Sequence, residues 1–106
     1  MAWMFVLAAG LLEIVWAYTM KLSQGFTRPG PSALTILAML ASFALLSLAM
    51  KTLPLGTAYT VWTGIGAVGA FAVGVVFLGE PLTTGRVVAA TLIVSGLIVM
   101  KLSTTA

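Results

Sequence analysis

One acidic residue, Glu13, stands inside a long apolar stretch of the sequence, from Ala2 to Met20. A carboxylate at the centre of a membrane span costs about 2.5–3.5 kcal/mol on insertion scales, so such a residue is by default a candidate functional site. Removal from water disfavours its charged form, whereas a bound cation favours it. The same carboxyl can therefore hold either a proton or a cation, which is the minimum requirement for exchanging one for the other. The alternative is a carboxyl that faces lipid headgroups on a tilted helix, or stays neutral beside a hydroxyl.

The residues one helical turn from Glu13 favour a site over a plain membrane anchor. Ala9, Gly10 and Ala17 lie at i−4, i−3 and i+4 and form a face of small residues that another backbone or a ligand can approach closely. Trp16, at i+3, adds an aromatic wall to this face. Taken alone, a tryptophan in a membrane helix is more commonly a packing residue.

A second group of candidate residues lies in the apolar block from Leu55 to Leu78. Tyr59, Trp62, Thr63 and Gly66 share one helical face at i, i+3, i+4 and i+7. A buried Tyr or Trp needs a hydrogen-bond partner, which the carboxylate of the first block can provide, and the rings can hold a cation by cation–π attraction. Ser42 is the most central hydroxyl of the block between them and can orient the carboxylate or simply bond to its own backbone.

Three glycines, Gly64, Gly66 and Gly69, formally match the dinucleotide-binding pattern GxGxxG. That pattern requires a preceding strand, a βαβ unit and an acidic residue about 20 positions later, and the sequence offers none of this context. We interpret the glycines instead as positions for close helix packing and as a hinge in the helix.

Charges and turn residues divide the chain into four apolar blocks, and the first three are near or above the length of about 20 residues that crosses a bilayer. The fourth block is short and spans only if its helix begins near Leu82, with Arg86 and Lys101 extending toward the two interfaces. We expect an all-α membrane protein, with residues 1–106 forming a single integral membrane domain. Its four transmembrane helices are expected at about residues 2–20, 31–50, 54–78 and 82–102.

The composition excludes several classes of protein. Of 106 residues, 61% are hydrophobic and 7% are charged, whereas soluble domains are about a quarter charged. The sequence has no Cys and no His, which excludes disulfides, thiol nucleophiles and the common zinc and haem sites. Five scattered basic residues form no nucleic-acid-binding patch. We expect no metal, no cofactor, no nucleic-acid partner and, because no nucleophile and base pair can be assembled, no enzyme.

The basic residues divide almost evenly between the two sides of the predicted membrane domain. Lys21, Arg28 and Arg86 lie on one side, and Lys51 and Lys101 lie on the other. Such a weak bias under the positive-inside rule predicts insertion in both orientations, with opposite copies pairing as an antiparallel homodimer. Four helices are also few for enclosing an aqueous pathway, which independently favours an oligomer. The small residues assigned to the contact between copies are Ala89, Ser95 and Gly96.

Three segments of the sequence together form a family pattern. They are Ala9-Gly-Leu-Leu-Glu13-Ile-Val-Trp16-Ala, Lys21-Leu-Ser-Gln-Gly-Phe-Thr-Arg28 and Leu53-Pro-Leu-Gly-Thr-Ala-Tyr59-Thr-Val-Trp62-Thr-Gly-Ile-Gly66-Ala-Val-Gly69. These segments resemble the small multidrug resistance family, and specifically its guanidinium-exporter subtype (Gdx or SugE). The resemblance covers essentially the whole chain, including the helix number and the loop lengths.

This resemblance implies an antiparallel, dual-topology homodimer, multi-pass in a bacterial inner membrane, that exchanges protons for a cation by alternating access. Glu13 matches the family's shared proton and substrate carboxylate, one from each subunit. The residues that match the polar and aromatic shell around that pair are Trp16, Ser42, Tyr59 and Trp62. One departure from the expected pattern is Pro29-Gly30-Pro31 in the first loop, away from the site.

Two other functions remain open at this point. A broad exporter of multiple drugs and quaternary ammonium compounds would bind cations that lack hydrogen-bond donors, through rings and apolar walls. A non-transporting membrane subunit would use Glu13 as an assembly contact with a partner protein. Small guanidinium-like cations, protons and membrane lipids are the partners that the main interpretation predicts.

Overall fold

The structure, a computed structural model, describes residues 1–104 and contains four α-helices within them. Each helix is long and apolar enough to cross a membrane, which confirms the all-α, four-span part of the prediction. The helices are α1 (Ala2–Leu22), α2 (Pro29–Ala49), α3 (Leu55–Phe77) and α4 (Thr84–Ser103).

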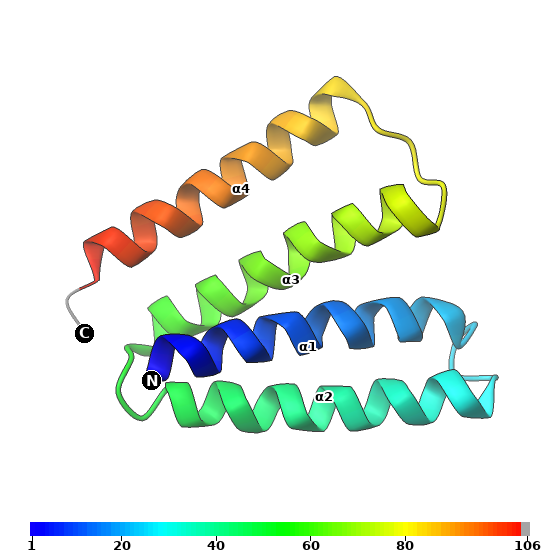
Figure 1. The fold of residues 1–106 in the computed structure, drawn as a ribbon, viewed down its shortest axis with the longest axis horizontal. Coiled ribbons are helices and arrows are strands. Elements are labelled where there is room, and N and C mark those ends of the chain that lie inside the picture. The colour runs from blue at the N-terminus through cyan, green and yellow to red at the C-terminus, as the bar shows by residue number, and fades with distance from the viewer. Residues whose placement is uncertain (105–106) are drawn as a thin grey trace.

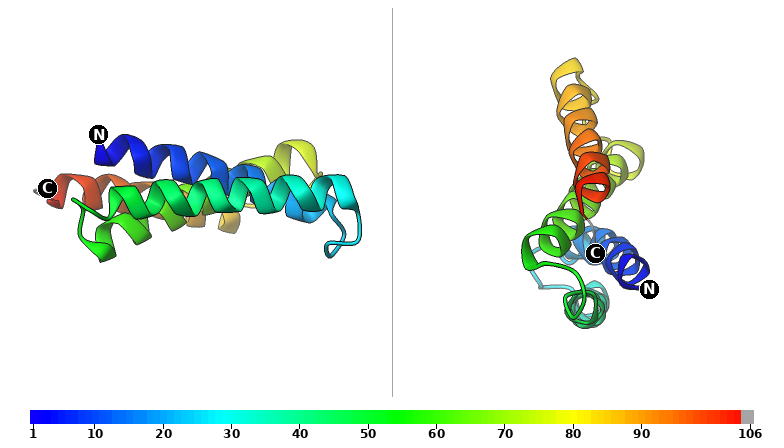
Figure 2. Two further views of the ribbon diagram at one scale, coloured as in Figure 1. Left: turned by 90° about the horizontal axis from the view of Figure 1, so that it is seen from below. Right: turned by 90° about the vertical axis from the view of Figure 1, so that its left-hand side faces the viewer.

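The four helices form a flat layer in which α1 contacts both α2 and α3 along its length (Figure 1), and the N-terminal half of α3 also meets α2. α4 lies on the far side of α3 and leans away from the other helices (Figure 2). The Cα positions extend over 42 × 34 × 16 Å. Because the smallest extent is less than half of either of the other two, the arrangement is flat and leaves much of each face open.

The buried residues of the layer lie where α1, α2 and α3 meet. Val6 and Ala9 of α1 pack against Leu46 and Ala49 of α2 and against Trp62 and its neighbours on α3. The small residues among them, Ala9 and Ala49, let the helix backbones approach closely, and such packing contributes to helix association in lipid. A buried hydrogen bond of 2.7 Å between the hydroxyls of Thr19 and Thr35 joins α1 to α2 nearer the other membrane face.

Local sequence explains where the helices begin. α2 starts at Pro29, because proline is tolerated in the first helical turn, and Arg28 before it is extended with φ −99° and ψ 119°. α4 starts at Thr84, slightly later than the expected position near Leu82, and Thr83 caps it by accepting a 3.2 Å hydrogen bond from the backbone N–H of Arg86.

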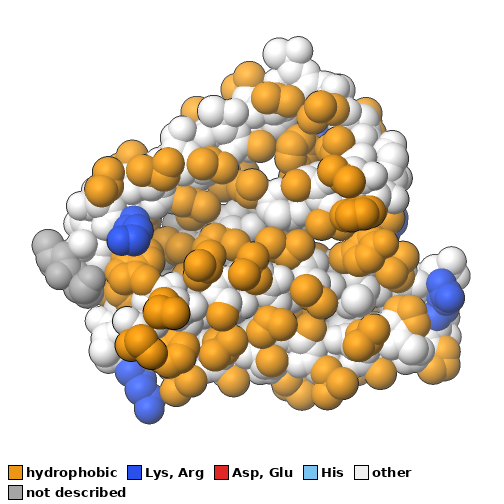
Figure 3. All heavy atoms as spheres, viewed as in Figure 1, with side chains coloured by type: hydrophobic (Ala, Val, Ile, Leu, Met, Phe, Trp, Pro, Cys, Tyr) orange, Lys and Arg blue, Asp and Glu red, His pale blue; other side chains and the backbone are white. Residues whose placement is uncertain are grey.

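The face of the layer that Figure 3 shows is largely apolar along the helices, and its basic side chains lie near their ends. No residue of α4 is buried, although the helix is as apolar as the others. One ion pair occurs within residues 1–104, at 3.2 Å between Arg86 and Glu80 in the connection from α3 to α4.

Candidate functional site

The Glu13 carboxyl lies at the interface of α1 and α3, against the backbone of Gly66. A methyl group added at Gly66 would overlap the carboxyl, so only glycine leaves room for it there. Oε1 of Glu13 is buried and has no hydrogen-bond partner among residues 1–104. A buried acceptor left without a partner costs about 1–3 kcal/mol, and more when charged, so a proton or a cationic donor at this oxygen would be stabilising.

The other glycines singled out from the sequence also lie at helix contacts. A Cβ atom at Gly64 would meet Leu97 of α4, and a Cβ atom at Gly69 would meet Ile14 of α1. Gly10 of α1 makes the reciprocal contact with Ile65 of α3. At these positions the lack of a side chain leaves room for a residue of the neighbouring helix, while the packing and hinge roles stay predictions.

Ser42 and Trp62 form a hydrogen-bonded junction of three helices one turn from Glu13. The indole Nε1 of Trp62 on α3 donates to Ser42 Oγ on α2 at 3.0 Å. Ser42 Oγ in turn donates to the backbone carbonyl of Ala9 on α1 at 2.7 Å. The hydroxyl of Ser42 thus bonds the backbone of α1 one turn before Glu13, and its part in orienting the carboxylate stays a prediction.

Four aromatic rings, one of them that of Trp62 itself, contact one another in a row at this junction. Trp16 and Phe43 lie edge to face at 6.4 Å between ring centroids, Phe43 and Trp62 at 5.9 Å, and Tyr59 and Trp62 at 5.4 Å. Nε1 of Trp16 is buried without a hydrogen-bond partner among residues 1–104. Phe43, which connects α1 to α3 through α2, was not among the residues predicted from the sequence. Its signal was its place directly after Ser42 as the one aromatic residue of the second apolar block.

The predicted face of Tyr59, Trp62, Thr63 and Gly66 is divided in the structure. Trp62 and Gly66 are buried, whereas Tyr59 is 53% exposed. Thr63 lines a cavity of about 340 Å³ between α3 and α4, with Ile93 across it. Tyr59 lines the same cavity and a second one of about 370 Å³ beside Phe43 and Trp62. Within one chain, Thr63 thus faces α4, away from the three-helix junction.

The residues assigned to contact between copies lie on the open surface of α4. Ala89, Ser95 and Gly96 are all exposed, and no atom lies within 4 Å of a Cβ atom built at Gly96. This surface is accessible to a second copy of the chain.

Comparison with known proteins gives the family. Residues 1–93 match the family model described as Small Multidrug Resistance protein. The chain belongs to the small multidrug resistance family. Proteins named guanidinium exporter from Citrobacter freundii and Salmonella typhimurium are each 57% identical to it over 104 residues, which is 98% of this chain and 99% of each relative. One from Escherichia coli (strain K12) is 55% identical over the same shares.

Membership of the small multidrug resistance family confirms the resemblance that the sequence motifs carried, including the similarity to guanidinium exporters. Together with the four apolar helices, it makes the chain a multi-pass membrane protein.

Proposed function

We propose that this chain is a proton-coupled antiporter that exports guanidinium or small guanidinyl cations by alternating access. The observation that carries this proposal is the Glu13 carboxyl, which lies deep within an apolar helix and has one buried oxygen without a partner among residues 1–104. The guanidinium exporters that are 55–57% identical to the chain support the substrate class.

The chemistry of guanidinium suits a carboxylate site. A planar guanidinium presents its N–H donors as a fork that matches carboxylate oxygens, as an arginine side chain does. Proton binding neutralises the same oxygens, so the two ligands exclude each other. Occupation by one and then the other, on opposite sides of the membrane, couples proton entry to cation export.

A dimer completes the proposed site. The Cα positions of one chain extend only 16 Å in the thin direction, which leaves little room for an enclosed water-filled route, and its α4 has no buried residue. An antiparallel homodimer that pairs through α4, at Ala89, Ser95 and Gly96, would bring a Glu13 from each copy to one central cavity. The bacterial relatives support a location in the bacterial inner membrane.

In this proposal the surrounding residues position the two carboxylates and form the walls of the site. Gly10 and Gly66 let α1 and α3 approach at the depth of Glu13. Ser42 and Trp62 hold the three helices together, and the residues that complete the wall are Trp16, Tyr59 and Thr63.

A second candidate is the export of alkylated or quaternary ammonium cations. It is favoured by the cavity of about 370 Å³ that Phe43, Tyr59 and Trp62 line, because three rings can bind a cation that has no hydrogen-bond donors.

The deciding experiment is electrical. The purified protein is reconstituted in liposomes, and currents are recorded on addition of guanidinium and then of a tetraalkylammonium ion. We expect guanidinium currents from the wild type and none from Glu13→Gln. The matched control is Glu80→Gln, which removes the other acidic residue of the sequence, a half-exposed loop carboxylate paired with Arg86, and should leave the currents intact.

Currents with the larger cation alone would favour the second candidate. If neither cation produces a current or a change of internal pH in liposomes with well-folded wild-type protein, the chain is better explained as a non-transporting membrane subunit.

A further inference from the structure

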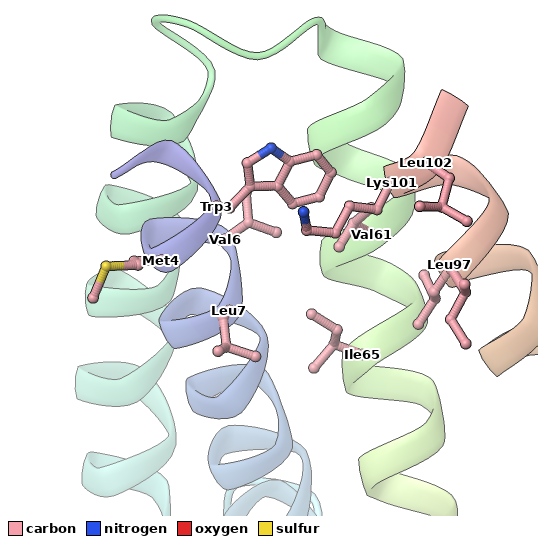
Figure 4. A pocket seen from close by; sticks show the side chains of 10 residues that line it. Trp3, Met4, Val6, Leu7, Val61, Ile65, Leu97, Lys101 and Leu102 are labelled. Atoms are coloured by element: carbon pink, nitrogen blue, oxygen red, sulfur yellow. The ribbon is translucent and has the colours of Figure 1, made fainter. Parts of the chain in front are cut away.

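An apolar groove of about 400 Å³ opens on the layer where α1, α3 and the end of α4 converge (Figure 4). Its volume lies within the range of about 300–1,000 Å³ that is usual for small-molecule sites. Leu7 of α1 and Ile65 of α3 line its inner end, and Leu97 and Ile98 of α4 line its side. Ile65 also contacts Gly10, so the floor of the groove lies about one turn from Glu13.

A cation stands at the mouth of this groove. Lys101 is the one charged residue among those that line it, and its Nζ lies 4.9 Å from the centroid of the Trp3 ring. The two side chains point toward one another across the mouth (Figure 4). Both belong to the end of the layer where α1 begins and α4 ends (Figure 1), and Trp and Lys are typical of the membrane–water boundary.

The side-chain carboxylates of the chain do not neutralise Lys101. The sequence has two acidic residues, and Glu80 pairs with Arg86 at the opposite end of the layer. Glu13 lies ten residues beyond Trp3 along α1, a rise of about 15 Å. An apolar groove with an ammonium group at its mouth is complementary to an amphiphilic anion. It is unfavourable for the cationic substrate of the proposed function, which Lys101 would repel.

We infer that this groove binds an anionic phospholipid, with one acyl chain between α1, α3 and α4 and the headgroup phosphate on Lys101. The acyl chain contacts Ile65 and Leu97, the side chains that also fit against Gly10 and Gly64. The lipid therefore fills the space between α4 and the α1–α3 pair, and its binding does not depend on what the protein transports.

Quenching of tryptophan fluorescence by brominated lipids tests this site, because Trp3 lines it. In a Trp16→Phe/Trp62→Phe background the remaining tryptophan is Trp3. The protein is reconstituted in phosphatidylcholine vesicles that contain a fixed minor fraction of either brominated phosphatidylglycerol or brominated phosphatidylcholine. We expect phosphatidylglycerol to quench Trp3 with an apparent affinity about fivefold higher, as one lysine near a phosphate provides.

Lys101→Gln should abolish that preference. Lys51→Gln, which removes an exposed lysine from the α2–α3 turn at the same end of the layer, should keep it. If both variants lost the preference for phosphatidylglycerol equally, general attraction to the basic surface would explain it and the site would be overturned. Equal quenching by the two lipids in the Trp16→Phe/Trp62→Phe protein would overturn the site as well. Absence of quenching by either lipid would show that a second copy of the chain covers the groove, which also overturns the inference.

A second pair of variants tests the acyl-chain part of the groove. Ile98 and Val99 are neighbours on α4 with similar exposure, 57% and 60%, but only Ile98 lines the groove. Ile98→Phe should weaken quenching by both lipids, whereas Val99→Phe should not. Native mass spectrometry of the protein with all its tryptophans, in a mixture of the two lipids, gives an independent measure. A phosphatidylglycerol adduct should survive in the wild type and be lost in Lys101→Gln, and adducts of equal abundance in both proteins would contradict the assignment.

Discussion

At Glu13, the depth of the carboxyl and the close approach of α3 have a common cause, which is the lack of a side chain at Gly66. The carboxyl occupies the space that a methyl group would fill, so α3 forms one wall of the site with bare backbone. Position 66 therefore controls where the carboxyl points.

Gly66→Ala should displace the Glu13 carboxyl and lower guanidinium-driven currents about tenfold or more, since small misplacements of a reacting group have effects of this size or larger. Gly56→Ala is the control on the same helix, because no atom lies within 4 Å of a Cβ atom built there. It should leave transport unchanged and stabilise α3 by up to about 1 kcal/mol. Normal currents from a well-folded Gly66→Ala protein would argue against a site at this contact.

Competition at one carboxyl predicts a pH dependence with a definite sign. Lower pH protonates Glu13, and a protonated carboxyl cannot pair with a cation, so the apparent affinity for guanidinium should fall as pH decreases. Binding measured by isothermal titration calorimetry over a series of pH values checks this. Affinity that does not change with pH would mean that the two ligands do not share the group.

Residue types and spacing predict which side chains belong to the candidate site, but they could not determine how those side chains are distributed over the helices. Helical periodicity gave Trp62 and Thr63 one shared face, and the structure turns Trp62 toward Ser42 and Thr63 toward α4. Neighbouring positions on a helix differ by about 100°, so a face wide enough to hold both can contact two different helices. Phe43 was missed because its role depends on α2 lying beside Trp16 and Trp62, which one helix alone does not reveal.

At the scale of elements, hydropathy was sufficient to find all four helices, because each is a nearly continuous apolar run between turn residues. The order α2, α1, α3, α4 across the layer was not predictable in the same way. In lipid, the outward face of a helix is as apolar as its packed face, so the distribution of apolar residues does not show which face packs against another helix. The informative residues are instead the small ones, such as Gly64 and Gly66. The sequence shows that they are small, but only the structure shows which residue each of them contacts.

The start of α4 depends on a single hydroxyl, that of Thr83. Thr83→Ala removes the acceptor for the N–H of Arg86 and should lower the free energy of unfolding by about 0.5–2 kcal/mol. Thr84→Ala, one residue later and also exposed, should be nearly neutral. Unfolding in mixed detergent, followed by far-ultraviolet circular dichroism, measures the free energy of unfolding of both variants. An equal decrease in both would mean that the loss of a threonine matters at either position and that the cap at Thr83 has no special effect.

At the scale of the whole molecule, the even distribution of basic residues predicts that copies insert in both orientations. The cysteine-free sequence makes this easy to examine. A single cysteine at Ser32 or at Thr52, near opposite ends of the layer, should react with a membrane-impermeant maleimide partly from outside the cell and partly only after the membrane is opened. Labelling of each position from one side alone would refute dual insertion.

The thinness of the layer has a genetic consequence. A carrier that encloses its own pathway can be complemented by an intact copy of its gene. On the proposed pairing, a chain of one layer must share its cavity, so a Glu13→Gln copy produced beside the functional chain would enter mixed assemblies that have one carboxylate in place of two. The Glu13→Gln allele is then expected to be dominant. Cells that produce both chains should tolerate less guanidinium than cells that produce the same amount of the functional chain alone.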